Sequence, residues 1–414
     1  MLACLLASLL TTSVARGADD ADGARYARAI DEVFTLIDER YAYLEDSKLD
    51  LARLREIYGP AARRAADDAV FVRVVKDVVD EMHDHHAGAW PNAPDDRRLV
   101  PSTTDLWADW VDDRAVITAV RAGSPGAEHG FRVGMTIESI DGASPERATS
   151  NEAPRAVRTL TEWSRGWALR VAMSGRLDAP VRIVAADEDG RVDATFTPGV
   201  FSRPRGPLTI RRLPDGSGYV RFNNSLGDTE TIRAFDAALD DLREAPGLIL
   251  DLRDTPGGGN TTVARGVLGR LTAEHRVYQR HALPMEERAF GVERSWAEYV
   301  SPRGAFAYEG RVIVLVGRWT GSMGEGMTLG LDAMGATVIG GPMARLRGAT
   351  SAYQLDEVKA WVSLPTETLF HPDGTPREEF VPRVRAKENG EPFGSPRDEA
   401  FQMAVGLLSR SSPP

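Results

Sequence analysis

A serine follows an apolar run in the segment RVIVLVGRWTGSMGEG, residues 311–326. The run at 311–316 predicts a buried strand, and the glycines around Ser322 predict a turn into a helix. At such a turn the serine hydroxyl is exposed at the carboxyl edge of a sheet, above a helix N-terminus, as a nucleophile requires. The N–H of Met323 faces the same space. The alternative is structural: Ser322 caps the helix and Glu325 completes an S-x-x-E capping box.

A glycine run follows a second apolar segment, GLILDLRDTPGGGN, residues 247–260. It predicts a buried strand, a turn at Gly257 and Gly258, and a helix over 261–270. N–H groups free of side chains at such a turn suit an anion or an oxyanion. The pattern G-x-x-x-x-G-K-[ST] is absent, so the segment is not a phosphate-binding P-loop. The alternative is a tight turn without a ligand.

Three histidines lie within MHDHH, residues 82–86. An imidazole with an ordinary pKa near ~6.5 suits a base that acts around neutrality. A metal site is the first alternative, but H-E-x-x-H is absent and no second cluster of ligands is evident. The second alternative is a set of solvated histidines at a helix end.

The candidate residues require a sheet that brings several strand ends together. Strand-like and helix-like runs alternate between residues 218 and 341, which predicts an α/β fold with a mostly parallel sheet flanked by helices. Residues 22–83 carry apolar side chains at helical spacing and predict a helical region that ends at the histidines. The predicted core elements are strands at 218–222, from 247, at 311–316 and at 338–341, and helices at 229–244, at 261–270, from about 321 and at 396–409.

Residues 98–180 have a different character. A strand at 115–120 leads to SPGAEHGFRVGMTIESIDG, residues 124–142. This stretch resembles a PDZ domain of the bacterial protease type, although Met135 stands where those domains usually carry Asp. The resemblance implies an inserted β domain that holds an extended peptide as an added strand. The alternative is a generic β-rich insertion.

Composition limits the classes of protein. The chain has 414 residues, a net charge of −11 and a pI near 5.3, which argues against nucleic acid as a partner. Cys4 is the only cysteine, so a disulfide framework and a cysteine metal site are excluded. Residues 2–15 are apolar and then small, which predicts a signal peptide over 1–18, although no Lys or Arg precedes them. No later run reaches the ~18 apolar residues of a membrane span. We expect a soluble protein that is secreted or periplasmic.

The order of three motifs resembles one family. GLILDLRDTPGGG, RVIVLVGRWTGSMGEG and ATVIGGPMARLRGAT occur in that order. Together they resemble the tail-specific (C-terminal-processing) serine peptidases, which include the tricorn core peptidase and the interphotoreceptor retinoid-binding proteins. The resemblance covers residues 25–408. It implies a helical region at 22–97, a PDZ-like domain at 98–180 and a ClpP/crotonase-like peptidase core at 181–414.

The resemblance also implies roles for individual residues. Ser322, in a T-x-S-x-x-E segment, is the implied nucleophile. The implied oxyanion hole is the N–H of Gly257 or Gly258 together with the N–H of Met323. Glu325 is expected to support the turn that carries the serine.

The general base distinguishes two branches of the family. One branch uses a lysine at the position that Arg347 occupies here, and an arginine stays protonated and cannot accept a proton. The other branch uses a histidine at the end of the helical region. This implies His86, with His85 as the alternative if the register differs by one residue.

The histidine branch orients its base with a glutamate near the C-terminus. The matching stretch, DGTPREEFVP at 373–382, departs from the family pattern at its end. Glu378 is the implied orienting acid, with Glu379 as the alternative.

These inferences predict a secreted serine endopeptidase that cleaves peptides or the C-terminal regions of proteins. The PDZ-like domain would hold the peptide, and no cofactor or metal is implied. Because Arg347 replaces the lysine, the alternative is a non-catalytic member of the same scaffold that binds an apolar ligand or a peptide.

Overall fold

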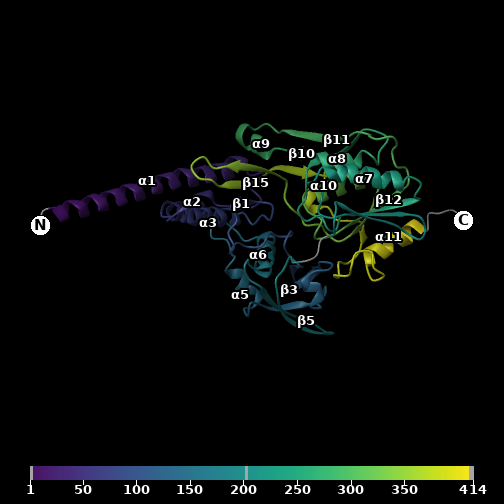
Figure 1. Ribbon diagram of the computed structural model, residues 1–414, viewed down its shortest axis with the longest axis horizontal. Helices are drawn as coiled ribbons and strands as arrows, with labels where there is room; N and C mark the ends of the chain where they lie inside the picture. Colours follow the sequence, from purple (N-terminus) through teal and green to yellow (C-terminus); the bar gives the residue numbers. More distant parts are fainter. Residues whose placement is uncertain (1–2, 201–203, 410–414) are drawn as a thin grey trace.

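The computed structural model describes residues 3–200 and 204–409, with side chains from residue 22 onward. These residues form three sheets and their covering helices (Figure 1). The long helix α1 (Ala3–Arg40) begins the described chain. The predicted signal peptide at 1–18 lies outside the residues whose side chains are described. Among the described helices, none combines the length and apolar character needed to cross a membrane.

A six-stranded sheet forms the centre of the core, in the order β16-β13-β12-β9-β8-β7. Every neighbouring pair from β8 to β16 is parallel, and only β7 pairs antiparallel, with β8. The prediction of a mixed α/β fold is confirmed. The strands are β7 (Leu208–Arg212), β8 (Gly218–Phe222), β9 (Gly247–Asp251), β12 (Arg311–Val316), β13 (Thr337–Gly340) and β16 (Val384–Arg385).

Alternate residues of the central strands face opposite layers of helix. Leu248 and Leu250 pack with α7 (Glu230–Asp241), α8 (Thr261–Leu268) and α10 (Met323–Ala333). The residue between them, Ile249, packs with α11 (Glu399–Ser409) on the other face. Both faces are apolar because helices cover both, as is usual for a parallel sheet.

The second sheet lies between the core and the N-terminal helices, in the order β1-β15-β10-β11, with β14 also paired to β15. The predicted helical region is three separate helices whose apolar faces pack with residues of β15. The elements of this layer are α1, α2 (Leu51–Arg63), α3 (Asp68–Asp80), β1 (Gly88–Trp90), β10 (Arg276–Ala282), α9 (Pro284–Phe290), β11 (Ser295–Val300), β14 (Ala349–Gln354) and β15 (Trp361–Phe370).

The third sheet is antiparallel throughout and projects below the other two in Figure 1. We call it the inserted sheet. It extends beyond residue 180 to the end of β6, and its edge strand β2 packs against α6. Its elements are β2 (Leu106–Val111), β3 (Arg114–Val120), α4 (Pro125–Glu128), β4 (Thr136–Ile140), α5 (Pro145–Ser150), α6 (Glu162–Ser174), β5 (Val181–Asp187) and β6 (Gly190–Phe196).

Candidate active site

The two turns that the sequence singles out meet at one edge of the central sheet. β9 and β12 are parallel neighbours, so their carboxyl ends lie together. The N–H of Thr255 donates to the carbonyl of Trp319 (3.0 Å), and the N–H of Gly321 donates to the carbonyl of Thr255 (3.2 Å). Ser322 follows with φ 51° and ψ −112°, at the start of α10. An L-residue adopts this conformation only under strain, which is common at functional positions.

Gly258 lies directly against Ser322. A Cβ added to Gly258 would lie 2.4 Å from Cβ of Ser322 and 3.2 Å from the nitrogen of Met323. The φ of Gly258 is +63°, which favours glycine in any case. The glycine run thus allows the two turns to approach more closely than any side chain permits.

The candidate oxyanion donors differ in their present partners. The N–H of Gly257 donates to Oδ1 of Asn224 (2.8 Å), and the N–H of Gly258 donates to the carbonyl of Thr255 (3.1 Å). Within the described chain, the N–H of Met323 has no hydrogen-bond partner. The N–H of Met323 is thus free to donate a hydrogen bond to an oxyanion beside Ser322.

Glu325 fixes the turn that carries the serine. Its carboxylate accepts hydrogen bonds from the N–H groups of Ser322 (2.9 Å), Arg345 (2.9 Å) and Leu346 (3.2 Å). The side chain is fully buried, and this burial raises its pKa to about 7, although the three N–H groups and the Arg377 guanidinium oppose the rise. Glu325 joins the serine turn to the segment 345–348, which we call the strap.

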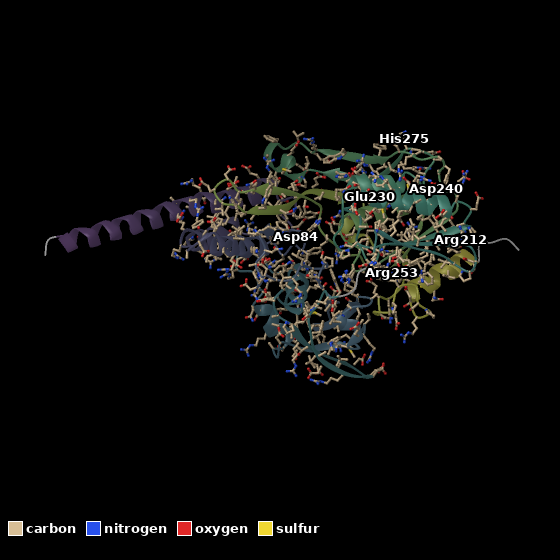
Figure 2. The ribbon with its side chains drawn as sticks, viewed as in Figure 1. Asp84, Arg212, Glu230, Asp240, Arg253 and His275 are labelled. Carbon is tan, nitrogen blue, oxygen red and sulfur yellow. The ribbon has the colours of Figure 1, made fainter. Side chains whose placement is uncertain are left out.

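His86 is held by its backbone and by its ring. Its N–H donates to Oδ1 of Asp84 (2.9 Å), whose Oδ2 accepts from the hydroxyl of Tyr41 (2.9 Å). Asp84, labelled in Figure 2, lies just after α3. Nδ1 of His86 lies 2.7 Å from the carbonyl oxygen of Arg347 in the strap. Because a carbonyl only accepts, Nδ1 carries the proton and Nε2 of the neutral ring is left as the acceptor.

The surroundings of His86 favour the neutral ring. Burial, together with the nearby guanidinium of Arg377, lowers the pKa of His86 to about 4. Arg377 is buried and donates through Nη2 to the carbonyls of Leu346 (2.8 Å) and Gly348 (2.6 Å). It therefore holds the strap on both sides of the carbonyl that orients His86.

The side chain of Arg347 packs against aromatic residues. Its Nη1 lies 3.4 Å from the hydroxyl of Tyr41, and its guanidinium stacks on the rings of Trp163 (4.3 Å) and Tyr43 (5.0 Å). The residue at the family's lysine position thus contributes its backbone carbonyl to the site, while its cation packs against aromatic rings.

Among the described residues, neither predicted orienting acid forms a hydrogen bond with His86. Glu378 and Glu379 belong to the short 3-10 helix η1 (Arg377–Glu379), in which Arg377 is the residue near the imidazole. Oε2 of Glu378 is buried without a hydrogen-bond partner among the described residues, and Glu379 is exposed. The partner of Nδ1 is the strap carbonyl and not the predicted carboxylate of Glu378.

His85 is engaged elsewhere. Its Nε2 accepts a hydrogen bond from Nε of Arg170 (3.2 Å), and its ring stacks on Trp167 with centroids 5.9 Å apart. Burial and the Arg170 cation lower the pKa of His85 well below its ordinary value. The nitrogen that a base would use is therefore already occupied.

Asp251 and Arg253 of the DLRD segment (residues 251–254) form buried ion pairs. Arg253, labelled in Figure 2, binds Asp398 through Nη1 (2.7 Å) and Asp251 through Nη2 (2.6 Å). Asp251 also accepts from the hydroxyl of Tyr219 (2.8 Å). These buried pairs anchor the end of β9 to the loop before α11.

The residues that sequence reasoning missed contribute a backbone carbonyl or a side chain that lies outside the recognised motifs. The strap carbonyl, the Arg377 clamp and the Asn224 contact involve groups that no motif marks. Among the described residues, no hydrogen bond joins Ser322 to His86, and no group of three or more His, Cys, Asp or Glu side chains is arranged to hold a metal.

Comparison with known proteins shows which family and which structures the chain resembles. Residues 216–382 match the model of peptidase family S41. The photosystem II D1 C-terminal processing protease superposes with a TM-score of 0.54 and 18% identity, over 88% of this chain and 93% of that one. Mature CPAF superposes with a TM-score of 0.58 and 14% identity, over 93% and 96%. At these identities the structures demonstrate a shared fold. No curated protein matches the sequence.

These findings confirm the predicted resemblance to the tail-specific serine peptidase family. The family match covers the glycine turn, Ser322, the strap and η1. The match supports the interpretation of this chain as a peptidase.

Proposed function

We propose that this chain is a serine peptidase in which Ser322 is the nucleophile and His86 is the general base. The observation that carries the proposal is the hydrogen bond from His86 Nδ1 to the carbonyl of Arg347, because it leaves Nε2 free to accept a proton. A backbone carbonyl here takes the orienting role that a carboxylate has in a Ser-His-Asp triad.

The proposed reaction begins when Oγ of Ser322 attacks the scissile carbonyl carbon and its proton passes to Nε2 of His86. The oxyanion accepts a hydrogen bond from the N–H of Met323. It accepts a second one from the N–H of Gly257 after that N–H leaves Oδ1 of Asn224. His86 returns the proton to the leaving amine, and water then hydrolyses the acyl-enzyme. The lack of a Ser322–His86 hydrogen bond agrees with this scheme, since such bonds are often long without substrate.

We further propose that the inserted sheet is PDZ-like and holds the peptide. β2 is an edge strand and lies beside α6, the arrangement that admits an added strand. In the structure Nε1 of Trp110 on β2 donates to the carbonyl of Arg165 on α6 (3.1 Å), so a peptide must displace this contact.

We also propose that the protein is exported, to the periplasm or beyond the cell. The apolar and small residues at 2–15 support this proposal. N-terminal sequencing of the protein purified from its native host should start near residue 19, and an intact Met1 in the exported fraction would contradict it.

The activity can be tested with fluorescein-labelled denatured casein. We expect hydrolysis by the wild type and a loss of about 10³-fold or more for Ser322→Ala and for His86→Gln. His275→Gln is the matched control, because His275 is exposed and lies well away from Asp84 in Figure 2. Hydrolysis that survives Ser322→Ala would refute the assignment of the nucleophile.

The alternative is a non-catalytic protein that binds a peptide or an apolar ligand. It is favoured by one observation, that the N–H groups of Gly257 and Gly258 both already have partners. Under this alternative the wild type binds the ligand but neither cleaves casein nor reacts with a serine-directed probe.

A further inference from the structure

The side chain of Asn224 lies at the edge of the central sheet that carries the candidate site. Asn224 follows β8 by two residues, and β8 is the parallel neighbour of β9. The carboxyl ends of β8, β9 and β12 share one edge of the sheet, so Asn224, Gly257 and Ser322 come to the same edge.

The carboxamide of Asn224 covers Gly257. A Cβ added to Gly257 would lie 3.0 Å from Oδ1 and 3.1 Å from Nδ2 of Asn224. The next residue, Gly258, has the same relation to the nucleophile, because a Cβ added there would lie 2.9 Å from Oγ of Ser322. Consecutive residues of the glycine turn therefore contact the carboxamide and the serine hydroxyl.

The contact with Gly257 determines which atom of the carboxamide faces the turn. A backbone N–H only donates, so the atom that lies 2.8 Å from the nitrogen of Gly257 is the acceptor, Oδ1. An oxyanion held by this N–H would stand at the same hydrogen-bond distance. Oδ1 of Asn224 therefore occupies the position that an oxyanion bound to Gly257 would take.

The carboxamide is held by one hydrogen bond. Among the described residues, the N–H of Gly257 is the single hydrogen-bond partner of the Asn224 side chain. The bond joins two neutral groups, and Asn224 is half-buried, so water can solvate the carboxamide when it turns away. An incoming oxygen atom can therefore replace Oδ1 at a small cost.

The backbone of Asn224 keeps the side chain beside the turn. Its N–H donates to the carbonyl of Asp254 (2.7 Å), which precedes the glycines. Its φ is +54°, a conformation that asparagine adopts more readily than most residues with a side chain. The residue is thus tied to the glycine turn through its backbone, while its carboxamide is free to exchange.

We propose that Asn224 is an internal latch, a side chain that closes the Gly257 half of the oxyanion site until a substrate carbonyl oxygen displaces it. The resting protein is therefore less reactive than the same site without this side chain. The inference rests on the proposed function, in which Gly257 and Met323 supply the two donors.

The test compares rates of Ser322 modification by a fluorophosphonate. Asn224→Gly removes the latch and suits the positive φ, so we expect modification about fivefold faster than in the wild type. Asn224→Asp keeps the shape but offers a charged acceptor, which binds an N–H more strongly, so modification should be slower. Lys48→Gly is the matched control and should react at the wild-type rate, because Lys48 also has a positive φ (+57°) but is exposed between α1 and α2.

A binding measurement separates the latch from the chemistry. Fluorescein-labelled penta-alanine amide is titrated against Ser322→Ala and against Ser322→Ala/Asn224→Gly, and fluorescence anisotropy gives the two affinities. We expect the double variant to bind about threefold more tightly, because the peptide carbonyl no longer competes with Oδ1. Tighter binding without modification of Ser322 in any protein would refute the peptidase proposal and support the latch.

Two results would overturn the latch. The first is an Asn224→Gly protein that reacts at the wild-type rate or more slowly, since slower reaction would mean that the carboxamide assists the oxyanion site. The second is equal peptide affinity of the single and double variants.

Discussion

Two hydrogen bonds hold His86, one at its backbone N–H and one at its imidazole ring, and the second determines which ring nitrogen can accept a proton. Asp84 fixes the backbone N–H, and the Arg347 carbonyl fixes the tautomer of the ring. The second contact leaves Nε2 unprotonated. At the scale of the residue the candidate base is therefore prepared by backbone contacts, with no carboxylate on Nδ1.

The first prediction concerns pH. The lowered pKa of His86, about 4, means that the ring stays neutral until the pH falls to that range. The rate of Ser322 modification by a fluorophosphonate should therefore persist well below pH ~6.5, where an ordinary histidine is half protonated, and fall as the pH approaches 4. A loss of rate centred near pH 6.5 would show that His86 is not held in this environment.

The second prediction concerns Gly258. In Gly258→Ala the new Cβ meets Ser322 at 2.4 Å, so the nucleophile must move. We expect reactivity to fall by about 10²-fold. Gly130→Ala is the matched control, because Gly130 also has a positive φ (+86°) but a Cβ added there would meet nothing within 4 Å. Both variants should lose about 1–2 kcal/mol of unfolding free energy from backbone strain, and only Gly258→Ala should lose reactivity. Equal reactivity in the two variants would contradict the packing of the turns.

The strap acts as a single element that serves both halves of the site. Its N–H groups bind Glu325 under the serine turn, and its carbonyl at Arg347 binds His86. Arg377 holds the flanking carbonyls. Any change in the strap should therefore affect nucleophile and base together.

The third prediction concerns the Arg377 clamp. Arg377→Met leaves two buried carbonyls without donors and should lower the unfolding free energy by about 2–4 kcal/mol. Because the Arg377 cation helps to lower the pKa of His86, its removal should move the acid limb of reactivity to higher pH. Arg377→Lys keeps the charge, so its acid limb should stay close to that of the wild type. If the methionine and lysine variants share one pH profile, the cation does not act on His86.

Sequence reasoning succeeded where one contiguous segment determines the local structure. The apolar run before Ser322 and the glycine run after β9 each predicted a strand and a turn, and parallel pairing brings the turns together. It failed for the second sheet, because β1 pairs with residues of β15 far along the chain. It also failed for the partner of His86, because any residue at position 347 supplies the same carbonyl.

At the scale of the whole molecule, the inserted sheet and its flanking loops contact both turns. Nε1 of Trp319 donates to the carbonyl of Thr104 (3.0 Å), next to the serine turn. Nη2 of Arg121 binds Asp254 (3.1 Å) at the start of the glycine turn. The insertion therefore supports the site from outside the segment that matches the peptidase family.

The fourth prediction concerns this support. Arg121 is buried, so Arg121→Gln leaves Asp254 without its cation and should lower the unfolding free energy by about 3 kcal/mol. The glycine turn should also loosen, which lowers the rate of Ser322 modification. Arg191→Gln, at an exposed pair of the inserted sheet, is the control. If Arg121→Gln is destabilised but its Ser322 is modified at the wild-type rate, the contact between the insertion and the glycine turn does not support the reactivity of Ser322.

The central claim is that Ser322 is a nucleophile activated by His86, and it can be tested without a known substrate. The protein is treated with a fluorophosphonate, and intact mass and peptide mapping locate the adduct. The account predicts one adduct, on Ser322, formed by the wild type and by His275→Gln but about 10³-fold more slowly by His86→Gln. No adduct on the folded wild type, or an adduct whose rate is unchanged in His86→Gln, would contradict it.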